Sequence, residues 1–218
     1  MIKACIFDLD GTLANTLPTL VSVGNRALAA CGYRTVNADR YPALIGKGAD
    51  QLITGLIYIA TMVPPWPGEL ARVRKEYDKL YAADPLYLTE QYDGIPATLS
   101  ALTARGIKTA VLSNKPHDMT CRVIEGLFPE HAFDVCFGQR PQIAKKPAPD
   151  AALEIADILG LSPAEVLFIG DSGVDMQTGA NAGMQTAGVL WGFRSEAELR
   201  ENGATYLIAR PDALLSLL

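Results

Sequence analysis

Cys5-Ile6-Phe7-Asp8-Leu9-Asp10-Gly11-Thr12-Leu13 decides the fold, because a short apolar run ends there in two carboxylates and a glycine turn. An unpaired carboxylate inside a buried strand costs too much free energy, so Asp8 and Asp10 belong at the carboxyl end of that strand. Ligands of open α/β sheets bind in the crevice outside the carboxyl ends of the strands. The stretch therefore predicts a functional site at the end of the first strand.

The rest of the chain divides into a helical block and an alternating block. Residues 16–85 carry apolar residues at helical spacing and contain no convincing strand. From residue 86 onward, helical patterns alternate with apolar runs of the buried-strand type, which predicts a parallel sheet with helices on both faces. We predict an α/β fold with a Rossmann-like core formed by residues 1–15 and 86–218. Residues 16–85 would be an all-helical cap inserted after the first strand, over the site. The predicted later strands are 107–112, 133–137, 166–169 and 186–190.

The composition argues against two classes of partner. Of the 218 residues, 49% are hydrophobic and 20% are charged, as in ordinary globular proteins. The net charge of −5 argues against nucleic acid, whose phosphates select clustered lysine and arginine. The most apolar segment, residues 52–63, is too short to span a bilayer and ends at two prolines. We therefore expect neither a nucleic-acid nor a membrane partner.

The cysteines and the start of the chain bear on localisation. Four cysteines without a CxxC pair predict buried free thiols in a reducing compartment. The first residues enter a strand at once and do not have the layout of a signal peptide. The expected localisation is cytoplasmic.

Three more segments at predicted strand or helix ends carry polar chemistry. Ser113-Asn114-Lys115-Pro116 follows strand 107–112 and offers a hydroxyl, an amide and helix-start N–H groups to an anion. Gly170-Asp171-Ser172-Gly173-Val174-Asp175 follows strand 166–169 with a second pair of carboxylates. Lys145-Lys146-Pro147-Ala148-Pro149-Asp150 places lysines before a helix in a stretch stiffened by prolines. Lys115 receives no role from the sequence and could be a surface charge.

Convergence of these ends would concentrate negative charge. Asp8, Asp10, Asp171 and Asp175 would lie close together, and two unit charges about 4 Å apart repel by about 4 kcal/mol at an effective dielectric constant near 20. Such a cluster requires a hard divalent cation, and Mg²⁺ prefers oxygen ligands. The cation would also let an acidic protein hold an anionic substrate. The sequence thus predicts Mg²⁺ as the cofactor.

The arrangement resembles the haloacid dehalogenase-like superfamily of aspartate-nucleophile phosphatases. The resemblance covers essentially the whole chain, because the helical block sits where that superfamily inserts its cap. Ser113-Asn114-Lys115-Pro116 and Trp191-Gly192-Phe193-Arg194 look most like its phosphoglycolate phosphatase branch, and the Lys-Pro-x-Pro register selects Lys146 over Lys145. The four motifs that match in order are Asp8-Leu9-Asp10-Gly11-Thr12, Ser113, Lys146 in Lys-Pro-x-Pro-Asp, and Gly170-Asp171 with Asp175.

The resemblance implies two displacements at phosphorus. Asp8 would attack and form an aspartyl-phosphate, and Asp10 would protonate the leaving oxygen and then activate the hydrolytic water. Asp8, the backbone carbonyl of Asp10 and Asp171 would hold Mg²⁺, and Asp175 would orient that shell. The presence of an acid at position 10 argues against a dehalogenase.

The resemblance also implies a phosphate cradle. Lys146 would act as a catalytic cation, and Ser113, Asn114 and Gly11 would contact the phosphoryl group. Gly46-Lys47-Gly48 resembles the substrate-facing loop of such caps, so Lys47 could bind a substrate anion; the alternative is an ordinary exposed lysine.

These expectations favour a magnesium-dependent phosphatase of small phosphate monoesters, with 2-phosphoglycolate as the leading substrate. A phosphosugar mutase similar to beta-phosphoglucomutase, an inorganic pyrophosphatase, or a catalytically silent binding domain on the same core are the alternatives. The expected partner is a small phosphorylated metabolite, and both a monomer and a homodimer remain open.

Overall fold

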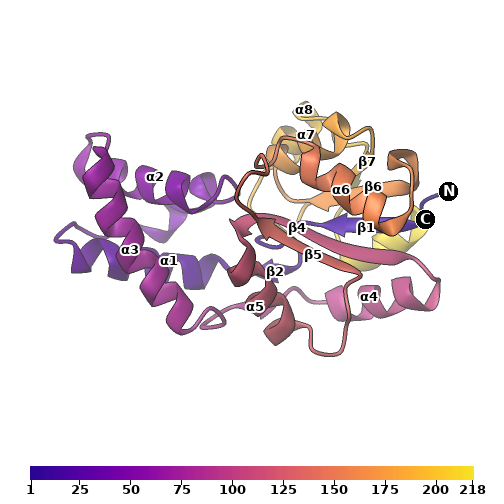
Figure 1. The fold of residues 1–218 in the computed structure, drawn as a ribbon, viewed down its shortest axis with the longest axis horizontal. Coiled ribbons are helices and arrows are strands. Elements are labelled where there is room, and N and C mark those ends of the chain that lie inside the picture. The colour runs from indigo at the N-terminus through magenta and orange to yellow at the C-terminus, as the bar shows by residue number, and fades with distance from the viewer.

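A six-stranded parallel sheet runs through the larger part of the molecule, which the computed structural model describes over residues 1–218 (Figure 1). Phe7 pairs with Val111 on one side and Ile169 on the other, so three strands end at one edge of the sheet. The predicted α/β fold is confirmed. In spatial order the strands are β5 (Val135–Gln139), β4 (Lys108–Pro116), β1 (Ala4–Phe7), β6 (Val166–Gly170), β7 (Gln185–Val189) and β8 (Tyr206–Ile208).

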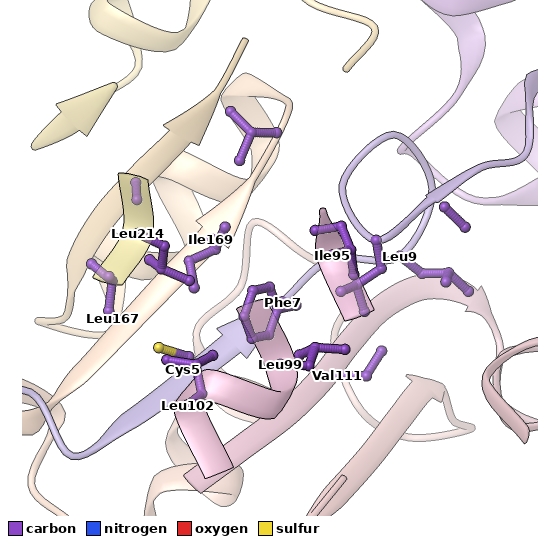
Figure 2. Packing of buried hydrophobic residues seen from close by; sticks show 14 of the residues in the cluster. Cys5, Phe7, Leu9, Ile95, Leu99, Leu102, Val111, Leu167, Ile169 and Leu214 are labelled. Carbon is purple, nitrogen blue, oxygen red and sulfur yellow. The ribbon is translucent and has the colours of Figure 1, made fainter. Parts of the chain in front are cut away.

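Helices cover both faces of this sheet (Figure 1). Side chains of a strand alternate between faces, so Cys5 and Phe7 of β1 pack on one side and Ala4 and Ile6 on the other. Figure 2 shows Cys5 and Phe7 packed with apolar residues of α4. The first face is covered by α4 (Ile95–Ala104), α5 (His117–Leu127) and the 3₁₀ helix η4 (Pro211–Ser216). The second is covered by α6 (Asp150–Leu159), α7 (Gly173–Asn181) and α8 (Glu196–Glu201), with the 3₁₀ helix η3 (Pro163–Glu165) before β6.

The three helices expected in the 16–85 block are present and lie beyond the carboxyl end of β1 (Figure 1). They enclose a hydrophobic cluster of their own, with 16 buried residues from Leu20 to Tyr81. We keep residues 16–85 as the proposed limits of this cap. Its elements are α1 (Leu17–Ala30), the 3₁₀ helices η1 (Ala38–Arg40) and η2 (Pro42–Leu44), α2 (Ala49–Thr61) and α3 (Pro67–Ala83).

A short antiparallel ribbon joins the cap to the core. β2 (Ala14–Asn15) pairs with β3 (Glu90–Gln91), so the outgoing and returning chains are hydrogen-bonded to each other where they cross. The sequence pattern did not predict this ribbon or the six-residue helix α8. All four cysteines are free thiols, but Cys121 and Cys136 are half-buried instead of buried. No helix combines the length and apolarity that a bilayer crossing requires.

Candidate active site

A cavity of about 220 Å³ lies between the carboxyl ends of the strands and the cap. Asp8 and Asp10 follow β1 directly and line it, together with Ser113, Asn114 and Lys115 of β4. The predicted carboxylates therefore stand at the strand end, as the cost of burying a bare charge inside the strand requires. The cap supplies the opposite wall, formed by Leu20, Ile45, Gly46, Gly48, Ala49, Leu52, Arg74, Tyr77, Asp78, Tyr81 and Ala82.

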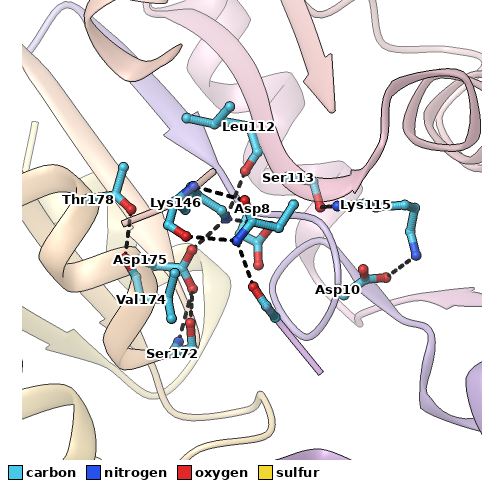
Figure 3. A network of polar contacts seen from close by, with 12 residues as sticks. Asp8, Asp10, Leu112, Ser113, Lys115, Lys146, Ser172, Val174, Asp175 and Thr178 are labelled. Atoms are coloured by element: carbon cyan, nitrogen blue, oxygen red, sulfur yellow. Dashed lines mark hydrogen bonds and ion pairs between the residues drawn. The ribbon is translucent and has the colours of Figure 1, made fainter. Parts of the chain in front are cut away.

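Lys146 is the cation closest to Asp8. Its ammonium lies 2.9 Å from Asp8 Oδ1 and 2.7 Å from Asp175 Oδ1, and it donates to the Leu112 carbonyl at 2.9 Å (Figure 3). Burial lowers the pKa of Lys146, but the carboxylates of Asp175 and Asp8 raise it above its ordinary value, so the ammonium stays charged. Lys145 is exposed, so the geometry agrees with the choice of Lys146.

Asp8, Asp171 and Asp175 form a cluster in which one carboxylate oxygen from each lies within 4.8 Å of the others. Asp171 is fixed by the Phe193 N–H, which donates to its Oδ2 at 2.7 Å. Gly11 makes room for this carboxylate, because a Cβ there would stand 2.3 Å from Asp171 Oδ2 and its φ of +88° is unfavourable for other residues. The Asp171 carboxylate is therefore fixed by the Phe193 N–H and by the close approach of Gly11.

Asp175 is held in this cluster by its own helix. Its Oδ2 accepts hydrogen bonds from the N–H and hydroxyl of Ser172, at 3.1 and 2.6 Å, which caps the first turn of α7 (Figure 3). Its Oδ1 faces Lys146 and the cluster. Asp175 thus has hydrogen-bonded support of the kind expected for a residue that orients ligands.

The charges of the cluster are not balanced. Burial raises the pKa of Asp8 to about 7, with Asp175 and Asp10 adding to the rise and Lys146 opposing it. Burial, Asp175 and Asp8 raise the pKa of Asp171 well above its ordinary value. Three buried carboxylates with one ammonium between them suit a hard divalent cation, since oxygen-only donors are those that Mg²⁺ prefers. The residues present therefore fit the predicted metal.

Asp10 stands apart from this cluster. Its Oδ1 lies 2.8 Å from the ammonium of Lys115, and both side chains are buried (Figure 3). Burial lowers the pKa of Lys115, but Asp10, Tyr81 and Tyr77 raise it above its ordinary value. Lys115 is thus a buried, charged member of the site. The only signal for it in the sequence was its place directly after Ser113 and Asn114 at a strand end.

The predicted phosphate contacts fall into two groups. Ser113 is buried on the cavity wall, where its hydroxyl accepts from the Lys115 N–H at 3.3 Å. Asn114 uses its amide on the backbone: Nδ2 donates to the carbonyls of Gly46 and Lys146 at 2.9 and 3.1 Å, and Oδ1 accepts from the Lys146 N–H at 2.9 Å. Asn114 therefore positions the loops around the site, and Gly11, which has no side chain, leaves room for the Asp171 carboxylate.

Lys47 is not brought to the site. It is exposed and lines a different hollow of the cap, beside Gln51 and Tyr58, although its neighbours Gly46 and Gly48 line the main cavity. The loop faces the core through its backbone, and the lysine side chain turns away. Lys47 therefore does not line the cavity that contains Asp8, and its role as a substrate contact stays a prediction.

The cap wall contains polar groups that the sequence did not reveal. Arg74 of α3 lines the cavity and pairs with Asp50 at 2.5 Å and Asp78 at 2.7 Å. Tyr77 and Tyr81, one turn apart on the same helix, stack with ring centroids 5.8 Å apart. Nothing in the helical pattern of α3 separates these cavity residues from ordinary core residues.

Comparison with known proteins places this geometry in a family. A family model described as haloacid dehalogenase-like hydrolase matches residues 5–189. The phosphoglycolate phosphatase of Aquifex aeolicus is 29% identical over all of this chain and 97% of its own length. The N-acetylmuramic acid 6-phosphate phosphatase of Pseudomonas aeruginosa is also 29% identical, over all of this chain and 95% of its own.

The fold gives the same result. The crystal structure of a predicted phosphoglycolate phosphatase from Haemophilus somnus 129PT superposes with a TM-score of 0.92 and 26% identity, over 99% of this chain and 97% of that one. The chain therefore belongs to the haloacid dehalogenase-like hydrolase family.

Proposed function

We propose that the protein hydrolyses small phosphate monoesters at the cavity between core and cap, through an aspartyl-phosphate on Asp8. The observation that carries the proposal is the set of contacts around Asp8: the ammonium of Lys146 lies 2.9 Å away, and Asp171 and Asp175 complete a carboxylate cluster. Asp8 lines a cavity of about 220 Å³, and the fixed cation and the candidate metal site lie directly against this nucleophile.

The reaction would proceed in two displacements. An Asp8 oxygen forms a bond to phosphorus while the bond from phosphorus to the ester oxygen breaks, and Asp10 gives its proton to the departing oxygen. Water then attacks phosphorus, Asp10 takes the water proton, and the bond from phosphorus to Asp8 breaks. Phosphate-monoester hydrolysis is among the slowest uncatalysed reactions, which explains the need for both groups.

The negative charge on the transferred phosphoryl group would be stabilised by protein side chains and by the metal ion. The three N–H groups of Lys146 are directed at Asp8, Asp175 and the Leu112 carbonyl, so its fixed charge would stabilise the negative charge that develops beside Asp8. Ser113 lies on the cavity wall and offers its hydroxyl. Mg²⁺ held by Asp8, Asp171 and the backbone carbonyl of Asp10, with Asp175 orienting that shell, would neutralise the carboxylates and the phosphoryl oxygens.

The leading substrate is 2-phosphoglycolate. The cavity of about 220 Å³ is smaller than the usual range for drug-sized ligands, which favours a compact ester. Several relatives are named phosphoglycolate phosphatase, including that of Aquifex aeolicus. The relative from Pseudomonas aeruginosa makes N-acetylmuramic acid 6-phosphate the second candidate, and the small cavity favours 2-phosphoglycolate over this larger sugar.

Phosphate release from 2-phosphoglycolate, N-acetylmuramic acid 6-phosphate and a generic aryl phosphate tests the proposal. We expect turnover that EDTA abolishes and Mg²⁺ restores. Asp8→Asn should lose at least about a thousandfold in kcat, because the amide is not a nucleophile. Asp157→Asn, on the exposed side of α6, is the matched control and should keep wild-type activity.

Quenching during turnover of labelled substrate should leave phosphate on the peptide that contains Asp8. Activity that survives Asp8→Asn would contradict the covalent mechanism. A phosphosugar mutase would release little phosphate and require a bisphosphate activator, and a pyrophosphatase would prefer pyrophosphate to every ester. The same assay therefore separates these alternatives.

A further inference from the structure

Two cationic side chains line the cavity, and they differ in the number of carboxylates with which they are already paired. Arg74 faces two carboxylates, Asp50 at 2.5 Å and Asp78 at 2.7 Å. Lys115 has a single acidic partner, Asp10 at 2.8 Å, although its side chain is only 5% exposed. An ammonium has three N–H donors and Lys115 has one carboxylate partner, so Lys115 is the cavity cation with donors left for a further anion.

The partner of Lys115 fixes what that anion would be. In the proposed reaction Asp10 touches the ester oxygen that leaves phosphorus, so the neighbouring ammonium faces the atoms bonded to that oxygen. We propose that Lys115 determines specificity by binding a carboxylate on the carbon that carries the ester oxygen; this rests on the proposed function and names its substrate class, the 2-phosphocarboxylates. The phosphoryl group would be served by Lys146, and the carboxylate by Lys115.

The surroundings of Lys115 support a small anionic group. The Lys115 ammonium lies 5.0 Å from the ring centroid of Tyr81 in the cap. The Tyr81 hydroxyl is buried, lines the same cavity and donates to no acceptor. Because the Lys115 ammonium and the Tyr81 hydroxyl are neighbours, both could donate to the oxygens of one carboxylate that lay beside them. Asp78 and Asp118 also line the cavity and would disfavour longer polyanions.

A charge-assisted contact of this kind sets the expected size of the effect. Hydrogen bonds to charged groups are worth enough to change affinity by roughly 10- to 100-fold. Wild-type enzyme should therefore prefer 2-phosphoglycolate to its isosteric amide, in which a carboxamide replaces the carboxylate, by roughly that factor in kcat/KM. The phosphoryl group is the same in both compounds, so their ratio isolates the carboxylate.

Lys115→Met is the first test variant and Lys115→Gln the second, in case the first does not fold. Both should reduce the ratio of kcat/KM between 2-phosphoglycolate and the amide to about one, while Lys115→Arg, which retains the charge, should keep a preference for the acid. Lys75→Met, an exposed lysine of α3, is the matched control and should keep the wild-type ratio. A folded Lys115→Met or Lys115→Gln that retains the wild-type ratio overturns the proposal.

Binding separates this proposal from the proposed function. Calorimetry on Asp8→Asn, which should not turn the substrate over, compares the Kd of 2-phosphoglycolate and of the amide with and without Lys115→Met. A preference for the acid that disappears with Lys115→Met supports the carboxylate site even if wild-type enzyme hydrolyses none of the esters. Equal affinity for the acid and the amide in Asp8→Asn overturns it even if phosphatase activity is present.

Discussion

Asp171 is a single residue at which the proposed function and folding stability oppose each other. Burial raises the pKa of its carboxyl group well above the ordinary value, and repulsion from Asp175 and Asp8 adds to the rise. Since the unfolded chain releases this proton at lower pH, the residue costs folding free energy as pH rises above its unfolded pKa. A bound cation would remove that cost.

Asp171→Asn should therefore raise stability in the absence of divalent cations. The amide oxygen can still accept the Phe193 N–H, while the charge is lost. We expect a melting temperature about 2–8 °C higher in EDTA at neutral pH, equivalent to about 1–2 kcal/mol. Adding Mg²⁺ should raise the melting temperature of the wild type more than that of the variant, and the variant should be inactive.

Differential scanning calorimetry with EDTA and with Mg²⁺ measures both effects. A lower melting temperature of Asp171→Asn in EDTA would contradict the charge argument. Equal stabilisation of both proteins by Mg²⁺ would contradict the assignment of Asp171 to the metal site.

Among single residues, the sequence predicted those whose chemistry is costly to bury. The carboxylates of Asp8, Asp171 and Asp175 required a cation or hydrogen-bond donors at the strand ends, and in the structure the three lie together in one cluster. Lys115 was not predicted, because a lone lysine beside a proline is equally compatible with solvent. That Lys47 lines a different hollow could not be predicted either, because the direction of a side chain between two glycines depends on backbone angles that residue types leave free.

At the scale of elements, the end of β4 is connected through Asn114 to two loops, one in the cap and one in the core. Its amide makes three hydrogen bonds to the backbone of Gly46 in the cap and Lys146 in the core. Removing it would leave the buried Lys146 N–H without this partner and the Lys146 side chain less well held. In the proposed reaction Asn114 would therefore be a positioning residue.

Asn114→Ala should lower the free energy of unfolding by about 2–3 kcal/mol, since buried backbone groups lose their partner. It should also lower kcat by about tenfold through the displacement of Lys146. Asn25→Ala is a matched control, because Asn25 makes a similar pair of backbone hydrogen bonds to Val36 inside the cap. Urea unfolding should show that both variants lose stability, whereas kcat should fall only in Asn114→Ala. Equal kcat in both would assign Asn114 a purely structural role.

Long elements could be predicted from the sequence, whereas the shortest ones could not. The cap helix α3, with 17 residues, repeats its apolar positions often enough for the helical period to be recognised, and α2, with 13 residues, is recognised as a long apolar segment. The ribbon strands β2 and β3 contain two residues each and are formed by pairing between chain segments about 75 residues apart, so no local pattern can predict them.

At the scale of the whole molecule, the cavity depends on how the cap is held over the core. The predicted insertion after β1 explains why the cap lies at the strand ends, because its two connections leave from that edge. The contacts that hold it there could not be predicted. Arg194, in the segment after β7, donates to the carbonyls of Pro42 and Ile45 in the cap, about 150 residues away.

Arg194→Ala should loosen this attachment and act on substrate binding more than on chemistry. The carbonyl of Ile45 accepts at 2.9 Å, and Ile45 and Gly46 line the cavity, so a freed loop leaves the substrate incompletely enclosed. We expect KM to rise about tenfold, as for the loss of one to two charged hydrogen bonds, with kcat within about threefold. Arg200→Ala, which removes an exposed arginine of α8 paired with Glu196, is the matched control and should leave both constants unchanged.

Arg194→Lys keeps the positive charge but cannot donate to two carbonyls in the fork geometry of a guanidinium. An intermediate KM for this variant would assign the effect to the two hydrogen bonds, whereas a wild-type KM would assign it to charge alone, since Arg194 also lies 3.3 Å from Glu198. If Arg194→Ala instead lowered kcat with KM unchanged, the cap would contribute through the geometry of the reacting groups and not through enclosure. The changes in kcat and KM of Arg194→Ala thus decide whether the attachment of the cap to the core contributes to substrate binding or to the alignment of the reacting groups.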